Sequence, residues 1–108
     1  MRLHTMNRYG LLAKRHMQEY LPAQYATIED PDRYFAELGE EISNQVAEVA
    51  SALEGPSPAD EDYMATVGRL RMARLMAEEK VLAEMAFLPP EPGSDPEEPE
   101  TDETGAYV

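Results

Sequence analysis

Residues 30–56 read DPDRYFAELGEEISNQVAEVASALEGP, a stretch that carries both the start and the stop signal of a long helix. Asp30-Pro31 suits a helix start, because the aspartate can accept hydrogen bonds from free N–H groups and proline fits the first position. Gly55-Pro56 is a typical helix end. We therefore predict a helix over about residues 31–53. Its apolar residues recur every three or four positions: Phe35, Leu38, Ile42, Val46, Val49 and Leu53.

A second long helix is predicted to follow directly. Ser57-Pro58 opens it, the acids at 60–62 favour its positive N-terminal end, and Pro89-Pro90 lies just beyond its expected end near Phe87. One apolar stripe should face inward, widened by Met64, Leu75 and Leu82. The stripe consists of Tyr63, Val67, Leu70, Arg74, Ala77, Val81 and Met85.

Arg74 is the one charged residue on that stripe. If the stripe is buried, the stem of Arg74 is buried as well, and its guanidinium needs acidic partners. Glu78, one turn along, and an acid of the preceding helix such as Glu41 are the expected partners. The alternative is that the stripe drifts around the helix and leaves Arg74 at the solvent-exposed edge.

The N-terminal segment is predicted to be helical from about residue 6 to residue 27, with a break near Tyr20-Leu21. Pro22 causes the break, because it lacks an N–H group and clashes with the preceding turn, and it can start a new short helix. Tyr25 and Ile28 should face inward. Two stripes fit the first part, one on Leu11, Leu12, Arg15, His16, Glu19 and Tyr20, the other on Met6, Tyr9, Ala13, Met17 and Tyr20.

Together these segments predict an all-α fold, a small bundle of about three helices. The connections are short, so the two long helices should form an antiparallel hairpin, with the kinked N-terminal helix packed across it. Residues 1–88 form the expected helical domain. Residues 89–108 are rich in proline and acids and nearly free of apolar residues, so we expect a disordered tail from there on. Gly39 and Gly68 are solitary mid-helix glycines, which suggests close helix crossings at both.

The net charge of −13 is unevenly spread. Residues 1–30 carry four cations and three anions (+1), residues 31–87 five and twelve (−7), and residues 88–108 none and seven (−7). Duplex DNA binding depends on cations that displace phosphate counterions, so direct binding is not expected. Only the N-terminal helix could form a local basic face. The acidic tail is either solubilising or a competitor for basic surfaces.

No catalytic or cofactor site is expected. The chain has no cysteine, which rules out disulfides and thiolate metal sites, and its two histidines, His4 and His16, lie in no ligand or triad motif. Glu78, Glu79 and Glu84 lack the Glu-x-x-His spacing of di-iron bundles. No stretch is long and apolar enough for a signal peptide or a membrane helix. These features predict a cytoplasmic, non-enzymatic protein without metal or cofactor.

Two methionines of the last helix lie off its apolar stripe. Methionine is an adaptable core filler and is also common on binding surfaces. Met72 and Met76 are therefore candidates for an exposed apolar patch that contacts a partner.

Two stretches resemble the TnpV family of small proteins encoded on transposons. The first contains Arg8-Tyr9-Gly10, Arg15, Glu19-Tyr20-Leu21-Pro22-Ala23 and Tyr25, and the second runs from Val67-Gly68-Arg69-Leu70 through Arg74 to Glu84. The chain differs from that family in its acidic tail and in having no tryptophan. The resemblance implies a mobile-element accessory role with no established active site. The residues that we single out for interaction are Arg8, Tyr9, Arg15, Tyr20, Arg69, Met72, Arg74, Met76 and Glu78.

Two functions remain open on the sequence. The first is an interaction protein of a mobile genetic element, accessory to a larger DNA-processing protein such as a transposase or recombinase. The second is an acidic inhibitor that imitates nucleic acid and blocks a host defence nuclease or CRISPR effector. Both require a protein partner, and a homodimer is compatible with either.

Overall fold

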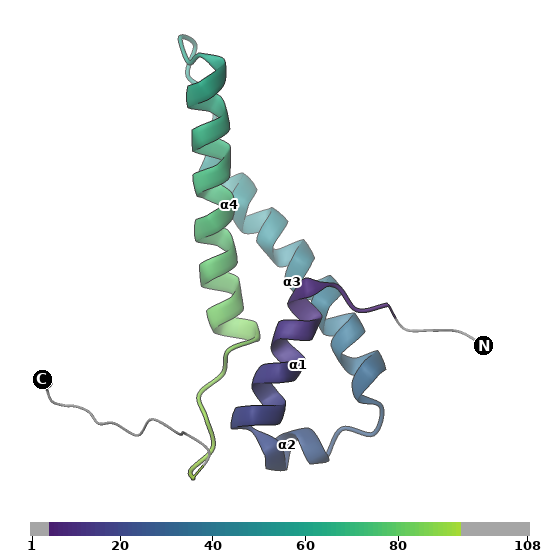
Figure 1. Ribbon diagram of the computed structural model, residues 1–108. Helices are drawn as coiled ribbons and strands as arrows, with labels where there is room; N and C mark the ends of the chain where they lie inside the picture. The colour runs from purple at the N-terminus through teal and green to yellow at the C-terminus, as the bar shows by residue number, and fades with distance from the viewer. Residues whose placement is uncertain (1–4, 94–108) are drawn as a thin grey trace, which may run out of the picture.

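The computed structural model describes residues 5–93, and these are all helix, turn or coil. The helices are α1 (Arg8–Tyr20), α2 (Pro22–Ala26), α3 (Pro31–Glu54) and α4 (Tyr63–Met85). Helices α3 and α4 run in opposite directions, and α1 lies beside the lower part of both (Figure 1). The predicted all-α bundle, a hairpin with a broken N-terminal helix, is confirmed.

Local side chains set most helix boundaries. Asn7, Asp30 and Asp62 cap α1, α3 and α4, each accepting a hydrogen bond from the N–H group three residues later. Pro22 starts α2 as predicted, after Leu21 leaves the helical conformation at φ −134° and ψ 52°. Gly55, with φ +63°, ends α3.

The predicted start of the last helix at Ser57-Pro58 is wrong, because α4 begins only at Tyr63. The intervening residues form a turn in which the Glu61 N–H group donates to the Pro58 carbonyl. The Glu61 carboxylate is then held by Arg69, so the acids of this stretch serve the loop and the cap rather than a first helical turn.

The core lies between α3 and its two neighbours. The largest fully buried side chains are Phe35, Ile42 and Val46 on α3 and Val81 on α4. From α1, the stripe of Tyr9, Ala13 and Met17 is buried, which selects the second of the two predicted stripes. Tyr25 and Ile28 pack against this core as half-buried side chains, as expected, whereas Leu53 at the end of α3 is exposed.

The predicted inner face of α4 is only partly correct. Ala77 and Val81 are buried, but Tyr63, Leu70 and Arg74 on the same stripe are exposed, and α3 is instead approached by Ala73. Apolar residues occur on all sides of α4, so their spacing does not single out one face. The position of α3 determines which side of α4 is covered.

Gly39 permits a close crossing between α3 and α1. A Cβ atom on Gly39 would lie 2.8 Å from the Gly10 nitrogen, and one on Gly10 would overlap the Phe35 carbonyl oxygen. The prediction for Gly39 is confirmed, with Gly10 as its unrecognised counterpart. At Gly68 the prediction is wrong, because a Cβ atom there would meet nothing within 4 Å.

The chain after α4 continues in the same direction and runs beside the second half of α1 (Figure 1). The Leu88 carbonyl lies 2.7 Å from His16 Nε2, and the Glu91 N–H donates to the Tyr20 carbonyl at 2.8 Å. The Glu91 carboxylate accepts hydrogen bonds from the N–H groups of Ala23 and Gln24 at the start of α2. The expected disorder from residue 89 onward is therefore wrong at Glu91. The part of that tail beyond Gly93 lies outside the described residues.

Candidate protein-interaction site

Four of the residues that the sequence singled out meet where the start of α1 approaches the second half of α4. The Tyr9 hydroxyl donates to Glu78 Oε2 at 2.6 Å, and Arg8 Nη2 donates to the same oxygen at 2.8 Å. Arg74 Nη2 donates to the Tyr9 hydroxyl at 3.2 Å. The Arg8 guanidinium also lies 4.9 Å from the centroid of the Tyr9 ring.

This cluster stabilises the ionised form of the Glu78 side chain. The hydrogen bond from Tyr9 lowers the pKa of Glu78, and the positive charges of Arg8 and Arg74 lower the pKa further. Tyr9 is buried and contributes the only hydroxyl of the group. The hydrogen bonds and ion pairs of these four residues are with one another. The cluster therefore joins α1 to α4 rather than forming an open ligand site.

Arg74 is not the buried hub that the stripe predicted. Its side chain is 51% exposed, and its Nε atom lies 3.7 Å from Glu78 Oε2. Glu41, the partner expected from the preceding helix, is exposed on α3. The alternative placement of Arg74 at the edge of the helix is the correct one.

Arg69 also has an internal role. It pairs with Glu61 at 2.8 Å, donates to the Glu54 carbonyl at 2.8 Å and donates to Ser57 Oγ at 3.0 Å. One guanidinium thus ties the end of α3 to the turn before α4. The planar, five-donor guanidinium suits this position. No local sequence pattern predicted this role, because the partners are separated by up to 15 residues.

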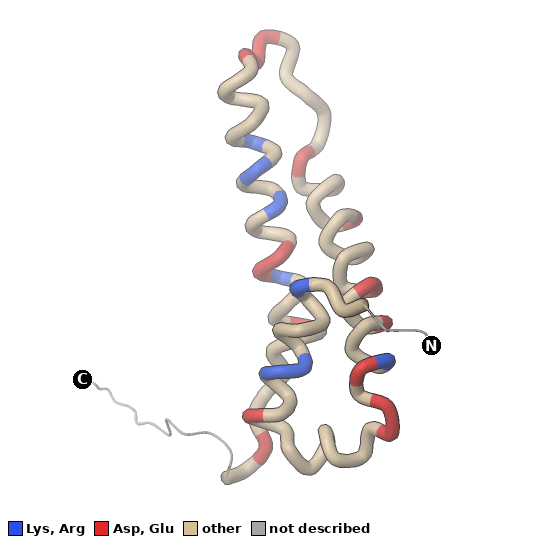
Figure 2. Tube along the Cα trace, turned by 45° about the vertical axis from the view of Figure 1, so that its right-hand side comes forward, with Lys and Arg blue, Asp and Glu red and all other residues tan. Residues whose placement is uncertain are grey.

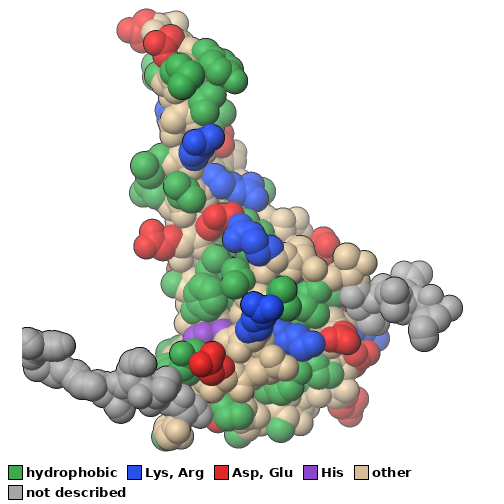
Figure 3. All heavy atoms as spheres, in the orientation of Figure 1, with side chains coloured by type: hydrophobic (Ala, Val, Ile, Leu, Met, Phe, Trp, Pro, Cys, Tyr) green, Lys and Arg blue, Asp and Glu red, His purple; other side chains and the backbone are tan. Residues whose placement is uncertain are grey.

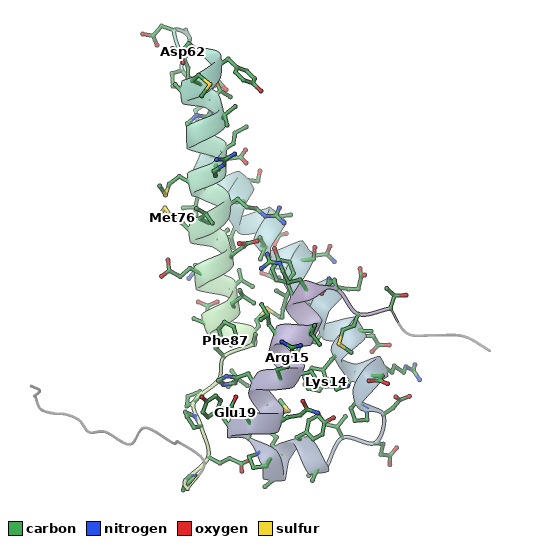
Figure 4. The ribbon with its side chains drawn as sticks, viewed as in Figure 1. Lys14, Arg15, Glu19, Asp62, Met76 and Phe87 are labelled. Carbon is green, nitrogen blue, oxygen red and sulfur yellow. The ribbon has the colours of Figure 1, made fainter. Side chains whose placement is uncertain are left out.

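The two remaining candidates on α1 differ in exposure. Arg15 is exposed and points outward near Lys14 (Figure 4). Tyr20 is half-buried, with its ring centroid 4.9 Å from that of His16. The ring centroid of His16 also lies 5.4 Å from that of Phe87. Tyr20 is therefore part of the contact between α1 and the segment that follows α4.

The side of α4 turned away from α3 and α1 is apolar and exposed. We call it the outer face of α4. Its exposed fractions are 72% for Met64, 57% for Met72, 54% for Leu75 and 49% for Met76. Figure 3 shows hydrophobic side chains standing out along this side, and Figure 4 shows Met76 pointing away from the other helices. The prediction that Met72 and Met76 are exposed is confirmed, whereas the prediction that Met64 and Leu75 face inward is wrong, because both lie on this uncovered side of α4. Its members are Met64, Gly68, Met72, Leu75 and Met76.

A second exposed surface is charged. Glutamates recur along the side of α3 opposite its buried residues (Figure 2). We call these the acidic row of α3. Its members are Glu37, Glu40, Glu41 and Glu48, all exposed.

The described residues contain no group of three or more His, Cys, Asp or Glu side chains placed to hold a metal ion. Between residues 5 and 93 no helix is long and apolar enough to cross a membrane. A groove beside the start of α3 is open and mostly lined by charged residues. Its lining consists of Ile28, Glu29, Asp30, Arg33, Tyr34 and Glu37.

Comparison with known proteins gives no match to a family model, to a curated protein or to a solved structure.

Proposed function

We propose that this chain is a non-enzymatic interaction protein that binds a partner polypeptide along the outer face of α4. The observation that carries the proposal is the exposure of Met64, Met72, Leu75 and Met76 along one side of a single helix. Large side chains of this kind, lined up on a regular helix, suit the docking of an apolar helix. Methionine favours such contacts because its unbranched side chain adapts to the shape of the partner.

We further propose that the partner belongs to the DNA-processing machinery of a mobile genetic element. The support is the resemblance to the TnpV family over Arg8–Tyr25 and Val67–Glu84. Two of its residues, Tyr9 and Glu78, contact each other across α1 and α4, which gives the two motif regions a common structural task. The proposed role is accessory or regulatory.

Affinity capture from the native host tests this function. A tagged wild-type chain should retain a transposase or recombinase, and Leu75→Glu should lose it, because a carboxylate would be buried in an apolar contact. Leu53→Glu is the matched control, since Leu53 is 47% exposed on α3. Equal capture by all three chains, with equal helicity by circular dichroism, would rule out the outer face of α4 as the binding site.

The acidic row of α3 favours a second candidate function. Glu37 and Glu41 are one helical turn apart, about 6 Å along the axis. Together with Glu40 and Glu48 they form a line of exposed carboxylates, in which Glu37 pairs with Arg33 at 3.2 Å. Such a line can imitate a phosphate backbone and occupy a basic nucleic-acid site. The partner would then be a defence nuclease or CRISPR effector.

Inhibition assays separate the two functions. If the second is correct, the chain inhibits such a nuclease, and the triple variant Glu37→Gln, Glu41→Gln, Glu48→Gln loses that inhibition while Leu75→Glu keeps it. If the first is correct, the triple variant still captures the partner and only Leu75→Glu loses it.

A further inference from the structure

The charged residues of α4 fall into two groups. Most have an ion-pair partner within the protein: Arg69 with Glu61, Arg74 with Glu78, and Lys80 with Glu84. Arg71 and Glu79 are both exposed, and neither makes an ion pair or hydrogen bond with any residue in the described range 5–93. They are of opposite charge but lie eight residues apart, about 12 Å along the helix, too far to pair with each other.

Arg71 and Glu79 lie at equal distances on either side of Leu75, which belongs to the outer face of α4. Arg71 lies four residues before Leu75 and Glu79 four residues after it, so the two charges flank Leu75 one turn away on each side. Leu75 is 54% exposed and central to the outer face. A twofold axis beside Leu75 would therefore place Arg71 of one chain level with Glu79 of another.

We propose that the outer face of α4 binds a second copy of this chain, with the two α4 helices antiparallel and Leu75 near the twofold axis. Each Arg71 then pairs with the partner's Glu79, twice per dimer, because a twofold contact repeats every interaction. This inference rests on the proposed function, since it concerns the same surface: the second copy covers the outer face of α4 in the free protein, and the larger partner competes with it for that face.

The charge distribution along α4 favours the antiparallel arrangement. Residues 63–77 carry three cations and no acid (+3), and residues 78–85 carry three acids and one lysine (−2). Figure 2 shows the cations gathered in the N-terminal half of α4. Antiparallel helices bring each positive half against a negative half, whereas parallel helices would bring like charges together.

The shape of the face also permits a helix to approach. Gly68 has no side chain, and a Cβ atom there would meet nothing within 4 Å, so this helical glycine has no packing role within the chain. A second helix at the outer face would give it one, since glycine allows backbones to come close. Helices α3 and α1 leave this side of α4 open in Figure 1.

The mass of the purified full chain tests the proposal. Sedimentation velocity and light scattering across a concentration series should show a monomer–dimer equilibrium for the wild type. Leu75→Glu should be monomeric, and Leu53→Glu, on the helix that packs against the other side of α4, should dimerise like the wild type. Circular dichroism of each variant confirms that the fold is retained.

Charge reversal tests the pairing itself. Arg71→Glu and Glu79→Arg each place two like-charged pairs across the twofold axis, which should weaken dimerisation about tenfold. The double variant Arg71→Glu, Glu79→Arg should restore the wild-type affinity. Mixing the two single variants should also restore it, because every facing pair is then of opposite sign. In a parallel dimer the single variants would be no weaker than the wild type.

A wild-type chain that stays monomeric at every concentration would overturn the inference. So would a dimer that Leu75→Glu leaves intact. Failure of the inference differs from failure of the proposed function. If the chain is monomeric and its Leu75→Glu variant still loses the captured host partner, only the proposal that a second copy binds this face is refuted. A Leu75→Glu variant that changes neither self-association nor capture refutes both.

Discussion

At the residue scale, the hydroxyl of Tyr9 joins helices that are far apart in sequence. It donates to Glu78 at 2.6 Å and accepts from Arg74 at 3.2 Å, and the Tyr9 ring is buried while Arg74 is half-exposed. Burial decides which of these contacts matters for stability, because an exposed ion pair is screened by water.

We expect Tyr9→Phe to lower the free energy of unfolding by about 1–2 kcal/mol, since it removes a hydrogen bond to a charged group. Arg74→Ala should lower it by less than about 1 kcal/mol, since its pair with Glu78 is largely solvated. Urea denaturation of the two single variants measures both losses. A loss of about 3 kcal/mol or more for Arg74→Ala would mean that the guanidinium is buried and paired after all.

Glu78 should make stability depend on pH in the acid range. Tyr9, Arg8 and Arg74 hold the pKa of Glu78 below its ordinary value of 4.5. A carboxyl with a lowered folded-state pKa adds stability above its unfolded pKa and loses that contribution as the pH falls through the folded value. The difference in unfolding free energy between the wild type and Glu78→Gln should be constant near neutrality and shrink below about pH 4.5. A difference that persists unchanged in acid would contradict this.

At the element scale, two glycines that each lie inside a long helix have different surroundings. Gly39 faces Gly10 across the crossing of α3 and α1, and Gly68 faces open space on α4. We expect Gly39→Ala to cost about 2 kcal/mol by overpacking the crossing. Gly68→Ala should add about 0.5–1 kcal/mol in dilute solution, because alanine is the better helix former. Thermal unfolding checks both, and equal effects at the two sites would show that the crossing is looser than described.

Helix α2 depends on a residue that lies beyond α4. Five residues cannot form a stable helix alone, and Glu91 supplies acceptors for the N–H groups of Ala23 and Gln24. Glu91→Ala should therefore cost about 0.5–1 kcal/mol, as the loss of a helix cap does.

Truncations give the matching control for Glu91. A chain ending at Leu88 should have a lower melting temperature than the full chain, because it lacks the contacts of Glu91 with α1 and α2. A chain ending at Gly93 should melt with the full chain, since residues 94–108 contain few apolar side chains that could pack. The same loss for both truncations would show that residues 94–108 contribute to stability.

At the scale of the whole molecule, the negative net charge should prevent this protein from binding duplex DNA. Figure 3 shows Lys and Arg side chains running from α4 down across α1, a basic strip longer than the single helix that the sequence suggested. Several of these cations have an ion-pair partner within the protein: Arg8 and Arg74 share Glu78, and Lys14 pairs with Asp32. With a net charge of −13, too few cations remain to release phosphate counterions.

We accordingly expect no mobility shift of a duplex at physiological salt. The measurement is a gel-shift titration with the full chain, repeated at low salt. A complex at physiological salt that weakens steeply as salt rises would show that the basic strip binds phosphates.

The sequence by itself determined the helices, apart from the start of α4. Asp30, Pro22 and Gly55 act on backbone groups within a few residues of themselves, so the breaks that they predict follow from local chemistry. On α3 the apolar residues occupy one side only, so the spacing of Phe35 and Ile42 also predicted the core.

Only the tertiary structure decided how those helices use their surfaces. On α4 apolar residues lie on every side, so the position of α3 determined that Ala77 is buried and Leu75 exposed. The same holds for Gly68, whose neighbours depend on which helix approaches, and for Glu91, whose partners lie 67 and 68 residues away. Such contacts join distant parts of the chain, and no local pattern encodes them, because their geometry exists only once the helices have packed.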